Sequence, residues 1–121
     1  MNQDRIERNP IVKLTFEFSL LIIQYCEVLE AKRKLVLSNQ LLKSGTSIGA
    51  NIREAQNAES KADFIHKFKI ATKEIDETQY WLQLCKYSSD YPSADDLLHK
   101  IEEIDKEVSK IISTSKKNNS I

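Results

Sequence analysis

An uninterrupted alternation of four- and three-residue spacings constrains the fold of this chain more than any other feature. It places on one helical face Phe64, Phe68, Ala71, Ile75, Thr78, Leu82 and Cys85. A helix with this repeat packs a seam of about three heptads against neighbouring helices. The segment begins with a capping-box-like pattern, in which Ser60 is the N-cap and Asp63 reaches back. The stretch predicts a long helix over residues 61–88 that packs among other helices.

Three further helices are expected, over residues 10–32, 38–58 and 94–113. The first begins with Asn9 as N-cap and Pro10 at the first helical position, where a missing N–H costs nothing. Because short connections join these segments, each helix should run antiparallel to the one before it.

Composition supports the same architecture. The chain has 121 residues, of which 40% are hydrophobic and 30% charged, with only two glycines and two prolines. Such a composition is typical of helices joined by short connections and not of sheets with many turns. We therefore predict one domain over residues 1–121, an all-α antiparallel up-down four-helix bundle. Residues 114–121 lack apolar periodicity and are expected to form a flexible tail.

The helix over residues 10–32 has more apolar surface than one bundle core requires. Besides its main stripe it has a second column, roughly 100° or more away around the helix, made of Val12, Phe16, Leu20 and Ile23. A monomeric bundle needs one apolar face, so this column predicts an oligomer interface, to which Trp81 is expected to contribute. The alternative is that this helix is simply more central than its neighbours.

Residues 40–60 combine helical glycines with a polar column. Gly45 and Gly49 lie inside the predicted helix, where each costs about 1 kcal/mol relative to alanine, which indicates close packing. The polar column is Ser47, Asn51 and Glu54. It has two interpretations: a buried hydrogen-bond network that fixes helix register, or a polar pocket at the bundle or ring axis.

Several stretches resemble the small four-helix-bundle proteins of the 23S rRNA intervening-sequence family. They are Gln-Leu-Leu-Lys-Ser at 40–44, Ser-Ile-Gly-Ala-Asn-Ile-Arg-Glu-Ala at 47–55, Phe64, Ile70-Ala71 and Glu-Thr-Gln-Tyr-Trp-Leu at 77–82. The resemblance implies a bacterial homopentamer with no firmly established activity. These proteins are also distantly similar to the accessory protein of diversity-generating retroelements, a basic pentamer that engages nucleic acid and a reverse transcriptase. Ala55 departs from the pattern, because many relatives have glycine there.

Positive and negative charges balance, with 18 Lys plus Arg and 18 Asp plus Glu. No global field attracts a polyanion, so a nucleic-acid surface has to be a local patch. The candidate contacts are Lys32, Arg33, Lys34, Lys69 and Lys73. The alternatives are that the first three complement a helix C-terminus and that the other two form a solvated face.

Other chemistry is not indicated. His66 and His99 lack the spacing of metal ligands, and Gly45 and Gly49 lack the context of a phosphate-binding loop. We expect no catalytic residues, no cofactor, no metal and no small-molecule substrate. Cys26 and Cys85 are expected to be reduced core residues.

The longest apolar run, Leu20 to Ile23, is too short for a membrane span, which predicts a cytoplasmic protein with no membrane contact. Two functions remain after these considerations. The first is a non-enzymatic homo-oligomer that binds RNA or a ribonucleoprotein. The alternative is a protein-protein interaction or accessory module with no nucleic-acid role.

Overall fold

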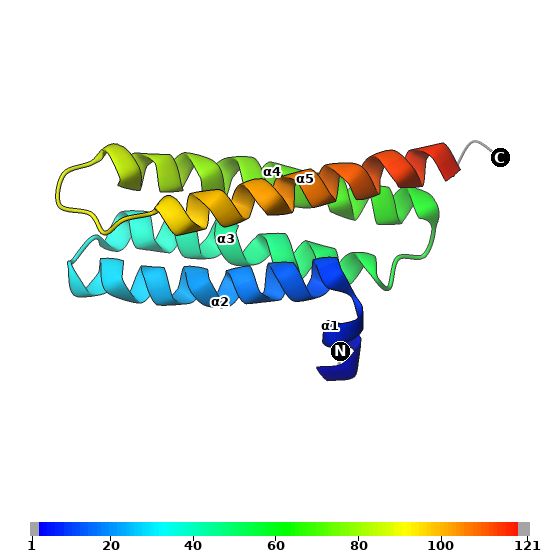
Figure 1. The fold of residues 1–121 in the computed structure, drawn as a ribbon, viewed down its shortest axis with the longest axis horizontal. Helices are drawn as coiled ribbons and strands as arrows, with labels where there is room; N and C mark the ends of the chain where they lie inside the picture. The colour runs from blue at the N-terminus through cyan, green and yellow to red at the C-terminus, as the bar shows by residue number, and fades with distance from the viewer. Residues whose placement is uncertain (1–2, 119–121) are drawn as a thin grey trace.

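The computed structural model describes residues 3–118, which form five helices (Figure 1). These are α1 (Gln3–Arg8), α2 (Pro10–Ala31), α3 (Leu35–Ala55), α4 (Lys61–Tyr87) and α5 (Asp95–Asn118). No strand occurs in this part of the chain. The prediction of an all-α protein is confirmed.

The four long helices, α2 to α5, lie side by side and alternate in direction (Figure 1). Helix α2 packs on α3, α3 on α4 and α4 on α5, and α5 also contacts α2. The short helix α1 contacts α2 and projects away from the long helices. Each long helix therefore has two helical neighbours and one outward face.

The predicted starts of α2 and α4 have the expected capping bonds. The Asn9 side chain accepts a hydrogen bond from the Val12 N–H (3.3 Å), and Ser60 Oγ accepts one from the Asp63 N–H (3.0 Å). The Asp63 carboxylate reaches back to the N–H of Glu59 (3.2 Å), one residue before the cap. Both helix starts are thus fixed by local sequence.

The core lies along the shared axis of the long helices. Its largest fully buried side chains are Phe18, Ile22, Leu29, Leu41, Ile48, Ile52, Phe68, Ile75, Leu82, Ile101, Ile104 and Val108. Full burial of a side chain of this size contributes roughly 1.5 to 3 kcal/mol. Because all four long helices supply members, the core holds them in one unit.

Close packing of α2 against α3 explains the two helical glycines. A Cβ added at Gly45 would lie 2.9 Å from Ile22 Cγ1, and one added at Gly49 would lie 3.2 Å from the Thr15 carbonyl oxygen. The first distance is shorter than real Cβ contacts, so Gly45 is required by the neighbouring helix. The expectation that these glycines mark a close approach is confirmed.

Several boundaries differ from the sequence expectation. Helix α3 begins at Leu35 instead of residue 38, because Ser38 is buried and donates a hydrogen bond to the Cys26 carbonyl (3.2 Å) instead of capping the helix. Helix α5 extends to Asn118, so residues 114–118 are helical and the predicted flexible tail is wrong there. Residues 119–121 lie outside the described part. Helix α1 was not predicted from the apolar pattern.

Candidate nucleic-acid interface

A shallow groove between α4 and α5 brings together lysines from both helices. Lys69 and Lys73 lie one turn apart on α4, and Lys116 lines the same groove from α5. The groove has a volume of about 530 Å³, and its other walls are Thr72, Ser109, Ile112 and Ser113. Within residues 3–118, none of the three lysines forms an ion pair. Uncompensated ammonium groups beside hydroxyls are suited to bind phosphate oxygens.

Sequence analysis placed Lys69 and Lys73 in this interface but missed Lys116. The apolar stripe of α5 ends at Ile112, and the helix was expected to end with it. Lys116 and Lys117 lie in the last turn of α5, where cations interact favourably with the helix dipole. That pair of lysines was the sequence signal for a longer helix.

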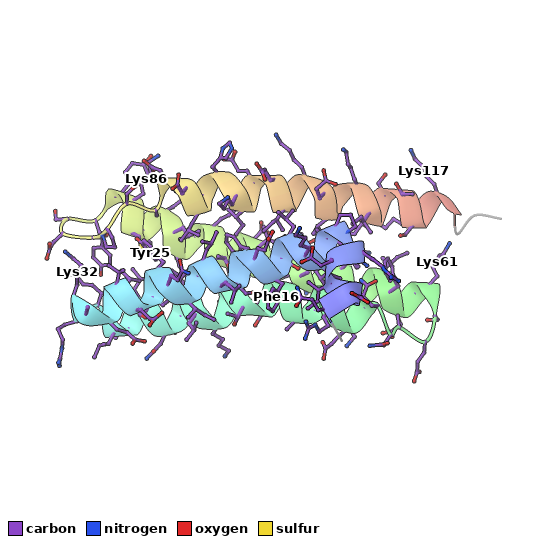
Figure 2. The ribbon with its side chains drawn as sticks, turned by 60° about the horizontal axis from the view of Figure 1, so that its bottom comes forward. Phe16, Tyr25, Lys32, Lys61, Lys86 and Lys117 are labelled. Atoms are coloured by element: carbon purple, nitrogen blue, oxygen red, sulfur yellow. The ribbon has the colours of Figure 1, made fainter. Side chains whose placement is uncertain are left out.

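The second predicted basic cluster, residues 32–34, lies at the other end of the long helices. Figure 2 labels Lys32 at one end of the molecule and Lys117 at the other. Lys32 Nζ is 3.2 Å from Asp90 Oδ1, and Lys34 Nζ is 3.7 Å from Asp90 Oδ2. The hydrogen bond from Lys32, followed by the charges of both lysines, lowers the pKa of Asp90. The two lysines therefore tie the turn after α2 to the connection between α4 and α5.

The polar column of α3 does not form the predicted network between helices. Ser47 Oγ donates to the Lys43 carbonyl (2.6 Å), and Asn51 Nδ2 donates to the Ser47 carbonyl (2.8 Å), both within α3. Glu54 is exposed, and its carboxylate lies 3.9 Å from Lys67 Nζ on α4. Ser47 and Asn51 are half-buried and satisfied locally, so they do not explain helix register.

A buried hydroxyl pair joins α3 to α4 instead. Thr78 Oγ1 lies 2.9 Å from Ser44 Oγ and also donates to the Glu74 carbonyl (2.7 Å). Both hydroxyl residues are fully buried. The column expected to fix helix register begins at Ser47, one turn beyond Ser44. Spacing alone does not tell which of these two serines faces α4.

Three of the four apolar residues expected on the outward face of α2 are exposed there. Phe16 is 40% exposed, Leu20 45% and Ile23 41%. Val12 is only 3% exposed, so its predicted place on this face is wrong. The segment after α3 covers the start of α2, where the Asn9 amide donates to Gln56 Oε1 (3.0 Å).

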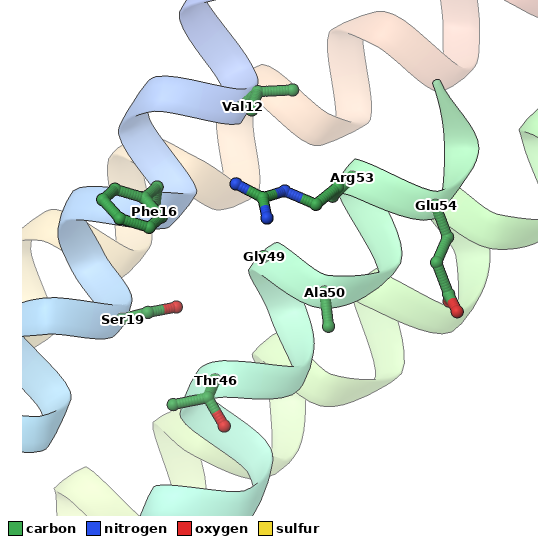
Figure 3. Close-up of a pocket in the computed structure, with 8 residues that line it drawn as sticks. All are labelled: Val12, Phe16, Ser19, Thr46, Gly49, Ala50, Arg53 and Glu54. Atoms are coloured by element: carbon green, nitrogen blue, oxygen red, sulfur yellow. The ribbon is translucent and has the colours of Figure 1, made fainter. Parts of the chain in front are cut away.

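A groove of about 370 Å³ between α2 and α3 adjoins this face (Figure 3). Phe16 and Ser19 line it from α2, and Gly49 and Ala50 line it from α3. The Arg53 guanidinium carbon lies 5.9 Å from the centroid of the Phe16 ring, and Figure 3 shows its side chain extending toward α2. Trp81, which was predicted to join the same interface, lines a different groove between α3 and α4.

Burial raises the pKa of three side chains that belong to the core or lie beside it. Burial raises the pKa of Cys26 and of Cys85, whose thiols are free. Burial, followed by the charge of Glu77, raises the pKa of Glu74. Thiols in apolar surroundings are poor nucleophiles, so both cysteines act as core residues, as predicted.

Among residues 3–118, no helix combines the length and apolarity needed to cross a membrane. Over the same residues, no cluster of three or more His, Cys, Asp or Glu side chains has the arrangement of a metal site.

Known proteins resemble the chain in sequence and in structure. The family model described as 23S rRNA-intervening sequence protein matches residues 7–114. A crystal structure of a protein of unknown function from the S23 ribosomal protein family of Bacteroides thetaiotaomicron is 41% identical, with a TM-score of 0.80. The match covers 84% of this chain and 97% of that one. Among curated proteins, none matches. On the family match, the chain belongs to the 23S rRNA-intervening sequence protein family.

Proposed function

We propose that this protein is a non-enzymatic, homo-oligomeric four-helix-bundle protein of the cytoplasm that binds RNA. The observation that carries the proposal is the groove between α4 and α5, where Lys69, Lys73 and Lys116 meet without an acidic partner among the described residues. The chain has no net charge, so this local concentration of positive charge is not a consequence of composition. A phosphate backbone is the ligand whose charge and repeated oxygens suit such a groove.

The membership of the family supports the same ligand class, since the family takes its name from intervening sequences in 23S rRNA. The candidate RNA is therefore a structured fragment of 23S rRNA, bound through its backbone. Phosphate contacts position a protein without selecting sequence, so the groove alone gives little discrimination between RNAs of the same shape.

The outward face of α2 supports the oligomer. Phe16, Leu20 and Ile23 expose large apolar side chains on consecutive turns, and a patch of this kind marks an interaction surface in a soluble protein. A contact between this face and an unlike face of the next subunit closes into a ring if the rotation permits. By resemblance to the family we propose a pentamer.

The same face also supports the alternative function, a protein-protein interaction module without a nucleic-acid role. In that case the partner covers Phe16 and the lysine groove is only a solvated surface. Purification from native cytosol, with sequencing of copurified RNA and mass spectrometry of copurified proteins, separates the two functions.

A gel-shift titration with a structured 23S rRNA fragment tests the RNA-binding proposal. At about 50 mM salt and micromolar protein, we expect the wild type to bind and the variant Lys69→Gln, Lys73→Gln, Lys116→Gln to bind at least tenfold more weakly. The matched control removes three exposed lysines outside the groove, Lys61→Gln, Lys100→Gln and Lys110→Gln. Equal weakening by both triple variants, or no binding by the wild type, would reject the groove as the RNA site.

A further inference from the structure

The groove that Trp81 lines lies beside the start of α3, at the end of the molecule opposite Lys116. It has a volume of about 490 Å³ and lies between the first turns of α3, the later part of α4 and the α4–α5 connection. Trp81 and Tyr91 contribute aromatic rings, Arg33 and Lys34 contribute cations, and Gln40 contributes a side-chain amide. None of the described residues that line this groove is an aspartate or a glutamate. Aromatic rings and cations together form the usual platform for an unpaired nucleotide.

The indole of Trp81 is held in place by its own helix. Its Nε1 donates to Glu77 Oε2 (3.3 Å), and the Tyr80 ring meets it edge-on at 5.2 Å between centroids. Trp81 is half-buried and still lines the groove. A ring that is fixed before binding loses little conformational entropy when a base stacks on it.

The cations of the groove differ in their availability. Lys34 lies 4.9 Å from the centroid of the Tyr91 ring and pairs with Asp90, so its charge is already engaged. Arg33 is exposed and forms no ion pair with a described residue. The backbone of Arg33 has a φ of 66°, and the N–H of Arg33 donates to the Glu30 carbonyl (2.9 Å). Arg33 is thus the cation that remains for a phosphate group at this groove.

We propose that this groove binds one unpaired nucleotide of an RNA, with the base stacked on Trp81 and its phosphate paired with Arg33. The Gln40 amide, which can both donate and accept, lies in the same groove and is available to the edge of the base. The proposal rests on the proposed RNA-binding function and adds to it a site for single-stranded RNA. An RNA with a loop or a free end satisfies both sites, whereas a blunt duplex satisfies only the lysine groove.

Trp81 is the only tryptophan of the chain, so its fluorescence reports on this groove directly. The full-length protein is titrated with adenosine monophosphate, a short oligoadenylate and a blunt RNA duplex. We expect the first two to quench the emission and the duplex to leave it unchanged. Trp81→Ala should weaken oligoadenylate binding by roughly tenfold or more, the typical effect of removing one stacking partner.

Control variants separate stacking from general damage. Trp81→Phe keeps an aromatic ring and should restore most of the affinity, whereas Tyr87→Ala removes an aromatic ring of α4 outside the groove and should have no effect. Arg33→Gln should weaken oligoadenylate binding and reduce its salt dependence by about one charge. Circular dichroism checks that each variant stays helical.

Three results would overturn this proposal. First, oligoadenylate could bind without quenching the emission, with equal affinities in Trp81→Ala and Tyr87→Ala. That result rejects the groove at Trp81 and does not bear on the lysine groove. An emission change that follows protein concentration alone shows that a second copy of the chain covers Trp81. Quenching that persists in Arg33→Gln with unchanged salt dependence removes the phosphate contact. Loss of RNA binding in the triple lysine variant, with nucleotide quenching retained, would instead support two separate sites.

Discussion

At the scale of single residues, the contact between α3 and α4 depends on two hydroxyl groups in an otherwise apolar core. Thr78 Oγ1 lies 2.9 Å from Ser44 Oγ, and both side chains are fully buried. Among the side chains that the structure describes, no buried nitrogen or oxygen lacks a partner. The directional bond between these two side chains is therefore suited to fix the register of α3 on α4.

Apolar contacts alone allow a helix to slide or rotate more easily than a directional hydrogen bond does.

A double-mutant cycle tests this pair. We expect Ser44→Ala and Thr78→Val each to lower the free energy of unfolding by about 1 kcal/mol. The double variant should cost less than the sum by about 0.5 kcal/mol or more, because each single change already breaks the shared bond. Urea denaturation provides the values. Thr46→Val is the control, since the acceptors of its hydroxyl, the carbonyls of Leu42 (2.7 Å) and Lys43 (3.5 Å), both belong to its own helix. If the losses of the two single variants add exactly in the double variant, Ser44 and Thr78 are not coupled.

Gly45 sets the distance between α2 and α3. Gly45→Ala improves helix propensity by about 1 kcal/mol, but its Cβ would lie 2.9 Å from two carbons of the buried Ile22 side chain. Overpacking of this kind costs roughly 1 to 3 kcal/mol, so we expect a net loss of stability. The variant Gly45→Ala, Ile22→Val should recover part of the loss, measured by thermal unfolding. A stabilised Gly45→Ala would show that α2 and α3 are not in close contact here.

At the scale of elements, much of the fold was predictable from sequence. The start of α2 follows from Asn9 and Pro10, and the seam of α4 follows from its regular spacing. Both features depend on residues close together in the chain.

What sequence did not reveal depends on contacts between distant segments. Val12 is buried although it belongs to the same column as the exposed Phe16, a difference that the pattern of α2 cannot indicate. Lys116 joins the groove because α5 continues past its apolar stripe and packs along α4. The position of Asp90 between Lys32 and Lys34 likewise requires two connections to meet.

The Asp90 contact gives a pH dependence whose sign follows from its pKa. The hydrogen bond from Lys32 lowers the pKa of Asp90 below that of the unfolded chain. The contribution to stability is therefore fully present above the unfolded-state pKa, about 4, and is lost as the pH falls through the lower folded-state value. Asp90→Asn keeps a residue that tolerates the observed φ of 63°.

We expect the wild type to be slightly more stable than Asp90→Asn at neutral pH, because the pair is exposed and screened by solvent. The difference between the two urea midpoints should shrink as the pH falls below about 4. Asp76→Asn, at an exposed aspartate without an ion pair in the described part of the chain, serves as the control. A difference that stays constant between neutral and acidic pH would mean that the carboxylate charge is not involved.

At the scale of the whole molecule, two kinds of surface are separate. The apolar face lies on α2, and the lysine groove lies between α4 and α5. Because α2 and α4 are not neighbours in the described packing, the apolar face and the lysine groove lie on different parts of one subunit. A ring of such subunits presents several lysine grooves to one RNA, which increases affinity through multivalency.

Phe16→Glu tests the assembly. We expect the wild type to have a mass several times the 14.0 kDa of one chain, and the variant to dissociate while remaining helical, because a charge at the interface core opposes burial. Light scattering coupled to size exclusion measures the masses. Tyr87→Glu places the same charge on another exposed aromatic residue and should leave the mass unchanged. A wild-type mass of one chain at micromolar concentration would reject the assembly, and a dimer would reject the ring.

The salt dependence of RNA binding tests the central claim most directly. Three lysines that each neutralise one phosphate give a slope of log affinity against log salt of about −2 to −3 per engaged subunit. We expect the wild type to bind a structured 23S rRNA fragment with at least this slope. We expect Lys69→Gln, Lys73→Gln, Lys116→Gln to lose most of it, while the control triple variant keeps it. A wild-type affinity that does not change with salt, or a slope that is equal in both triple variants, would contradict RNA binding through this groove.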